Sequence, residues 1–138
     1  MESKAFLDTS FAIALSVESD AHHEHAVILS EQLEREQTKL ITTAAILFEI
    51  GNALSKKRYR SAAVELLDSL EQDKTVEIIR IDSELYRKAF ELFRNRPDKD
   101  WGLVDCISFI VMQEQQMFEA LTTDEHFEQA GFRALLRS

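Results

Sequence analysis

The sequence predicts an α/β domain with a mainly parallel central sheet. Short apolar or β-branched segments alternate with longer segments of helical spacing, a pattern that favours parallel strands joined by helical crossovers. The chain has 138 residues, 45% of them hydrophobic, which is enough for one domain core over residues 1–138. With 3 glycines and 1 proline, its loops should be short. Right-handed crossovers would place helices on both faces of the sheet.

Each helix is predicted from apolar residues that recur three or four positions apart, and each strand from a short apolar or β-branched run. In the first half we expect a strand over 4–7, a helix through Leu15 capped by Thr9 or Ser10, a helix over 21–35 capped by Asp20, a strand over 40–42 and a helix over 44–57. In the second half we expect a helix over 61–70, a strand over 76–81, helices over 83–93 and 103–114, a strand over 119–122, a turn at Gly131 and an edge strand over 132–136.

The composition excludes several classes of protein. A single cysteine, Cys106, rules out an internal disulfide, and its apolar surroundings predict a buried thiol in a reducing, cytoplasmic compartment. No apolar stretch is long enough to span a bilayer, and the start of the chain lacks a secretory signal, so we expect a soluble protein without a membrane partner. The net charge of −9 predicts weak nonspecific binding to nucleic acid or a basic partner.

Four carboxylates stand out by their surroundings. Asp8 ends the first expected strand, and Asp124 follows a later strand. The carboxyl ends of parallel strands share one edge of a sheet, where ligands bind in α/β proteins, so these two acids can meet there. Glu49 sits among apolar residues of a helix, where an unpaired charge would be costly. Asp105 lies in the first turn of the most apolar helix, where the helix dipole favours negative charge.

Taken alone, each acid has a simpler interpretation. Asp8 and Asp124 could be turn residues. Asp105 could merely complement a helix dipole, and Glu49 could pair with an arginine. Together, four acids at one edge of a sheet favour a functional site.

Clustered carboxylates repel one another and take up protons unless a cation offsets their charge. Oxygen ligands suit Mg²⁺ or Mn²⁺. These ions stabilise charge on a phosphoryl group and lower the pKa of a water molecule, so no protein nucleophile is required. The four acids therefore predict metal-dependent chemistry on a phosphate.

Four sequence blocks resemble the motifs of the PIN-domain family. Residues 6–10 (Phe-Leu-Asp-Thr-Ser) resemble its opening motif, and Thr42-Thr43 followed by residues 48–54 is similar to its second motif. Residues 100–109 and 120–132 look like its third and fourth motifs, in the style of VapC-like toxins and their free-standing relatives. The blocks cover nearly the whole chain in order, and the last two are specific.

The resemblance implies a three-layer α/β/α fold and a metal-dependent endoribonuclease, the toxin of a VapBC-type toxin–antitoxin pair. Residue by residue, Asp8, Glu49, Asp105 and Asp124 match the acidic quartet that binds Mg²⁺ or Mn²⁺ and carries catalysis. The family also implies an RNA substrate, a homodimer that uses apolar faces of early helices, and a small antitoxin that blocks the site. Gly102 stands where this style of motif usually has Ser, which should weaken the turn without removing a ligand.

Several polar residues have two interpretations. Asp100 could support the site, but a loop or capping role is slightly favoured. Ser10 and Thr123 could hydrogen-bond the ligands, with capping as the default. The basic run from Lys56 to Arg60 could flank the substrate path or complement the end of the preceding helix, and neither is favoured.

The histidines and two late phenylalanines are expected to be structural. His22, His23 and His25 are interpreted as a solvated helix face, and His126 is expected at the surface. Phe127 and Phe132 are expected in the core.

An alternative function within the same fold is an RNA-binding or partner-regulated subunit with little nuclease activity that is not a toxin. Two other classes fit poorly. A receiver-type phosphoacceptor needs an adjacent acidic pair and a late lysine, and a dehalogenase-like phosphatase needs Asp-x-Asp where residues 8–10 read Asp-Thr-Ser. Metal-stimulated RNA cleavage would distinguish the nuclease from the binding subunit.

Overall fold

Residues 3–137, the part of the chain that the computed structural model describes, form a five-stranded, all-parallel sheet in the order β3-β2-β1-β4-β5. The strands are β1 (Lys4–Leu7), β2 (Lys39–Thr43), β3 (Val76–Ile79), β4 (Glu119–Leu121) and β5 (Arg133–Ala134). The helices are α1 (Thr9–Ser16), α2 (His23–Arg35), α3 (Ala44–Ala53), α4 (Arg60–Gln72), α5 (Ser83–Asn95), α6 (Leu103–Glu114) and α7 (Glu125–Gln129), with a 3₁₀ turn, η1, at Lys57–Tyr59.

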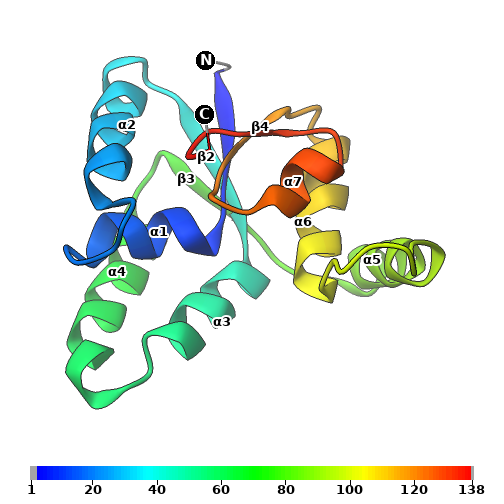
Figure 1. The fold of residues 1–138 in the computed structure, drawn as a ribbon, viewed down its shortest axis with the longest axis horizontal. Helices are drawn as coiled ribbons and strands as arrows, with labels where there is room; N and C mark the ends of the chain where they lie inside the picture. Colours follow the sequence, from blue (N-terminus) through cyan, green and yellow to red (C-terminus); the bar gives the residue numbers. More distant parts are fainter. Residues whose placement is uncertain (1–2, 138) are drawn as a thin grey trace.

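Helices cover both faces of the sheet (Figure 1). α1, α2 and α4 lie on one face, and α5 and α6 lie on the other, which gives three layers. α3 lies beyond the end of β2, at the carboxyl edge of the sheet. The predicted α/β/α fold class is confirmed, and every strand pair is parallel.

The core fills the space between the sheet and both helix layers. Phe6 of β1 and Ile41 of β2 are register partners, and both are fully buried. On the α6 side, the ring of Phe109 makes edge contacts with Trp101 at 5.0 Å and with Phe127 at 5.1 Å between centroids. Such aromatic pairs stabilise by about 0.5–1.5 kcal/mol beyond their burial. This cluster packs α6 against α7 and against the segment that precedes α6.

Most expected elements are present, with shifted ends. α6 has the predicted bounds, whereas α2 begins at His23 rather than at residue 21, because the Asp20 side chain accepts the His22 N–H at 2.8 Å and holds a turn there. α3 ends at Ala53 rather than at residue 57. Ala53, the last residue of α3, is exposed.

α7 was not expected from the sequence. It has only five residues, too few for a helical repeat of apolar positions to be visible. Its single buried residue, Phe127, is in the core as predicted. The turn predicted at Gly131 is present, with a φ of 96° that favours glycine, and the last strand is a two-residue edge strand.

The structure also bears on the buried thiol and the membrane-spanning segments considered from the sequence. Cys106 is completely buried, and burial raises the pKa of its thiol to about 11. Among the described residues, no helix combines the length and apolar character needed to cross a membrane.

Candidate active site

Four acidic side chains line one open pocket of about 730 Å³. Asp8 comes from the end of β1, Glu49 from α3, Asp105 from the first turn of α6, and Asp124 from the segment between β4 and α7. The pocket lies at the carboxyl edge of the sheet because β1 and β4 pair in parallel and end side by side. The sequence therefore brings together acids that are up to 116 positions apart.

Asp8 is the most deeply buried member, with 8% of its surface exposed. Thr122 Oγ1 donates a hydrogen bond of 2.7 Å to Asp8 Oδ2, and Ser10 Oγ donates one of 3.2 Å to the same oxygen. Burial raises the pKa of Asp8 to about 6, and the nearby charges of Glu49 and Asp105 add to the rise. The hydrogen bonds from the Thr122 hydroxyl and the Thr9 backbone N–H offset part of it.

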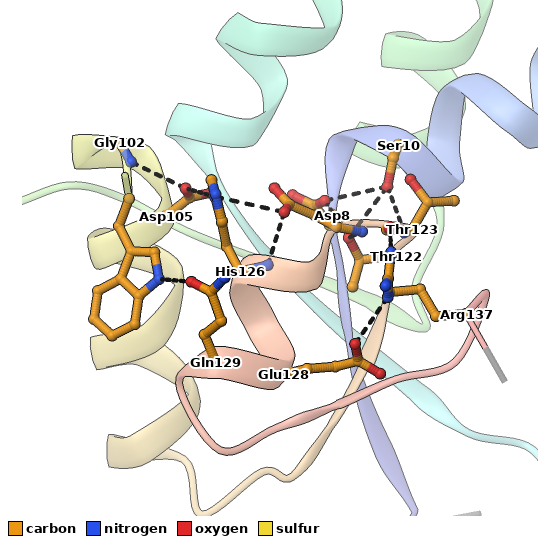
Figure 2. A network of polar contacts seen from close by, with 12 residues as sticks. Asp8, Ser10, Gly102, Asp105, Thr122, Thr123, His126, Glu128, Gln129 and Arg137 are labelled. Carbon is orange, nitrogen blue, oxygen red and sulfur yellow. Dashed lines mark hydrogen bonds and ion pairs between the residues drawn. The ribbon is translucent and has the colours of Figure 1, made fainter. Parts of the chain in front are cut away.

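A network of hydroxyls and backbone amides joins the ends of β1 and β4 (Figure 2). Ser10 Oγ accepts the Thr123 N–H at 3.0 Å, and Thr122 Oγ1 accepts the Asp124 N–H at 3.0 Å. The default capping role expected for Ser10 is wrong, because its hydroxyl bonds to the segment that follows β4. Thr122 was missed at the sequence level, although its place two residues before an acid at a strand end is a usable signal.

Glu49 approaches from α3, on the opposite side from β4. Thr9 Oγ1 donates a hydrogen bond of 2.7 Å to Glu49 Oε1, so Glu49 pairs with a hydroxyl and not with the arginine that the sequence left open. Glu49 is half-buried, and its neighbour Phe48 is 70% exposed. The helix therefore has a solvent-facing side here, although the residues around Glu49 in the sequence are mostly apolar.

His126 connects the remaining two acids, and the expectation that it lies at the surface is wrong. Its Nδ1 lies 2.9 Å from Asp105 Oδ2 and 3.5 Å from Asp124 Oδ1 (Figure 2). Burial lowers the pKa of His126, but the hydrogen bond to Asp105 and the surrounding carboxylate charges outweigh it, so the net pKa is raised. One ligand atom from each of these three residues falls within 4.8 Å of the others, close enough to share an ion.

Backbone groups hold the two acids that flank His126. The Gly102 N–H donates to Asp105 Oδ2 at 3.0 Å, and Asp124 caps α7 by accepting the His126 N–H at 2.8 Å. Gly102 has no side chain to cap α6 in return, but its contact with Asp105 uses only the backbone. Asp105 is therefore held in place, and the weaker turn expected from Gly102 stays a prediction.

Two sequence candidates lie outside this acidic pocket. Asp100 is exposed and lines a different hollow, beside Arg96 and Trp101, which favours its loop interpretation. The cations from Lys56 to Arg60 follow α3 and are exposed.

The family model of the PIN domain matches residues 5–133, nearly the whole chain. The chain belongs to the PIN domain family. The four acids thus occupy one pocket of a PIN fold.

Two curated PIN relatives match over most of their length. The chain is 28% identical over 127 residues to the 23S rRNA-specific endonuclease VapC20 of Mycobacterium tuberculosis, covering 92% of this chain and 94% of the relative. It is 29% identical over 125 residues to a VapC ribonuclease of Archaeoglobus fulgidus, covering 89% and 78%.

Solved structures give the same PIN fold. The crystal structure of VapC20 from Mycobacterium tuberculosis, a toxin that cleaves the sarcin-ricin loop, superposes with a TM-score of 0.81 at 26% identity, over 93% of this chain and 95% of that one. The crystal structure of VapBC2 from Rickettsia felis, bound to a DNA fragment from its promoter, superposes with a TM-score of 0.70 at 14% identity, over 95% and 96%. The second likeness concerns the fold alone.

Proposed function

We propose that this PIN domain is a metal-dependent endoribonuclease of the VapC type, which acts as a toxin in the cytoplasm and hydrolyses RNA phosphodiester bonds. The observation that carries the proposal is the convergence of Asp8, Glu49, Asp105 and Asp124 on one open pocket. Similarity over most of the chain to two VapC ribonucleases supports the choice of RNA as substrate.

The donor set fits a hard divalent cation. Carboxylate oxygens from four different elements line one pocket, and the nearby charges of Glu49 and Asp105 add to the rise that burial causes in the pKa of Asp8. Mg²⁺ or Mn²⁺ would be held by the four acids. When bound, such an ion stabilises negative charge on a phosphoryl group and lowers the pKa of a water molecule.

The protein's own residues fix the geometry of the reaction. Thr122 and Ser10 hold Asp8 Oδ2 in place, and Thr9 orients Glu49 across the pocket. A carboxylate whose position is already fixed needs no reorganisation when the ion and substrate arrive, and this lowers the free energy of the transition state. The scissile phosphate would enter from the open side of the pocket.

The His126 ring lies between two of the four acids. Its Nδ1 is close to both Asp105 and Asp124, and a protonated ring would offset the negative charges of these two carboxylates. We therefore assign His126 as a positioning residue, which holds the two carboxylates close together before the ion binds.

A small VapB-type antitoxin and a second copy of this chain are the proposed protein partners. The large apolar residues Ile28 of α2 and Val64 of α4 are 63% and 52% exposed, so the early helices offer the apolar surface that a homodimer would use. The antitoxin would act by covering the acidic pocket.

The direct test is cleavage of a fluorescent RNA by the purified chain, with Mg²⁺ or Mn²⁺ and with EDTA. We expect cleavage only with the ion, and its loss in Asp8→Asn and Asp105→Asn. An inactive wild-type chain that still binds RNA would instead support the binding-subunit function.

A further inference from the structure

A cluster of cations stands beside the acidic pocket and has no role in the site described so far. We call residues 56–60, which contain Lys56, Lys57, Arg58 and Arg60, the basic turn. Ala53, the last residue of α3, lines the acidic pocket, and the basic turn begins three residues later. In Figure 1 this segment joins α3 to α4 at the end of α3 that is farther from the sheet.

The cations of the basic turn differ from most others in the chain because they lack acidic partners. Elsewhere in residues 3–137, seven Lys and Arg side chains form ion pairs with described carboxylates: Lys39, Arg80, Arg87, Lys88, Arg96, Arg133 and Arg137. Within residues 3–137, no carboxylate lies at ion-pair distance from Lys56, Lys57 or Arg58, and all three side chains are exposed. Their charge is therefore available to an external anion.

Stability of the fold explains the placement of Arg60 but not that of the two lysines. η1 leads directly into α4, which begins at Arg60, and the amino end of a helix carries a partial positive charge that disfavours nearby cations. Arg60 holds the segment that follows α3, because its guanidinium donates two hydrogen bonds, of 2.7 and 3.1 Å, to the Ser55 carbonyl oxygen. Lys56 and Lys57 make no comparable contact within the described chain.

We propose that the basic turn binds the phosphate backbone of the RNA strand next to the cleavage position. This inference rests on the proposed ribonuclease function. Three residues lead from Ala53, which lines the acidic pocket at the end of α3, to Lys56. Because an extended chain spans at most about 3.6 Å per residue, the basic turn begins no more than roughly 11 Å from the pocket wall. At about 3.4 Å per stacked nucleotide, that distance corresponds to two or three phosphates. A chain with a net charge of −9 needs such a local concentration of cations to hold a polyanion.

The test compares two double variants with the same change in net charge. Lys56→Gln/Lys57→Gln removes two cations from the basic turn, and Arg35→Gln/Lys74→Gln removes two exposed cations that precede β2 and β3, at the opposite edge of the sheet. Binding of a fluorescent single-stranded RNA is measured by anisotropy in EDTA, which prevents metal-dependent cleavage, at 50–200 mM salt.

We expect only the basic-turn variant to lose affinity, by about tenfold at 200 mM salt and by more at 50 mM. Each phosphate contact contributes about 0.7 to the slope of log K against log salt for single strands, so this slope should become shallower by about 1.4. The melting temperature and its increase with Mn²⁺ should match those of the wild type. In the wild type, bound RNA should protect Lys56 and Lys57 from acetylation, a readout that does not depend on the folding of any variant.

The outcomes separate this inference from the proposed function. If the wild-type chain cleaves RNA but both double variants bind it equally well, the basic turn has no role in RNA binding and the inference is overturned. The same holds if RNA gives no protection of the two lysines, or if the basic-turn variant changes only the oligomeric state. If the wild type neither binds nor cleaves RNA, the proposed function itself fails.

Discussion

Replacing Asp8 by Asn should stabilise the metal-free protein while abolishing its response to metal. A rise in the pKa of Asp8 from 3.8 to about 6 corresponds to about 3 kcal/mol at about 1.36 kcal/mol per pKa unit. The folded state binds this proton more tightly than the unfolded state, so this group contributes stability below pH 3.8 that is lost as the pH rises through about 6. Above pH 6, the ionised carboxylate therefore opposes folding.

Asn removes that charge but fits the hydrogen bonds less well. Asp8 accepts from the hydroxyls of Thr122 and Ser10 and from the Thr9 N–H, and an amide group supplies only one acceptor oxygen. The mismatch should cost about 1–2 kcal/mol, which leaves a net gain of about 1–2 kcal/mol at pH 7.5. For a domain of this size, the gain corresponds to a melting temperature higher by roughly 3–8 °C.

The assay is thermal unfolding in EDTA between pH 4.5 and 7.5, followed by titration with Mn²⁺. The advantage of Asp8→Asn over the wild type should grow as the pH rises towards about 6 and level off above it. The wild type should gain about 2.7 kcal/mol at a Mn²⁺ concentration 100 times its Kd, and the variant should gain far less. A variant that is less stable at every pH, yet keeps its Mn²⁺ response and its RNA cleavage, would refute the assignment of Asp8.

Three further predictions concern other parts of the molecule. His126→Ala should destabilise the metal-free protein near pH 6 and change its stability little at high pH, because a raised His pKa contributes stability that is lost as the pH rises through the folded-state value; unfolding at several pH values checks this. Ile28→Glu should convert the proposed dimer to a monomer in light scattering, and a wild-type chain that is already monomeric at micromolar concentration would argue against the dimer. Gly131→Ala should lower the free energy of unfolding by about 1 kcal/mol, since φ is 96° at this position, and denaturant titration would measure the loss.

The strands and the helices α1 to α6 were predictable because each follows from a local pattern. The apolar run of α6 and the short β1 gave their bounds correctly, since a buried helix and a buried strand leave a clear mark in the sequence. The end of α3 was not predictable, because the helical spacing of apolar residues gives no sign that the chain turns towards η1 after Ala53.

The candidate site was predictable only in part, for a similar reason. Asp8 and Asp124 could be placed at one edge because parallel strands end together, which is a rule of topology. The link from His126 to Asp105 joins residues 21 positions apart and depends on the unexpected helix α7. No local pattern marks such a contact. The metal and catalytic roles of the four acids stay predictions until the experiments above are made.

The acidic composition of the chain is compatible with a polyanionic substrate because charges act locally. At physiological ionic strength the Debye length is about 8 Å, so exposed acids farther from a phosphate than this are largely screened. What decides RNA binding is then the charge within reach of the strand: a pocket where bound metal would offset the four acids, and a basic turn that begins three residues beyond Ala53 of the pocket wall. Net charge instead affects the long-range approach of RNA, which should be slow at low salt.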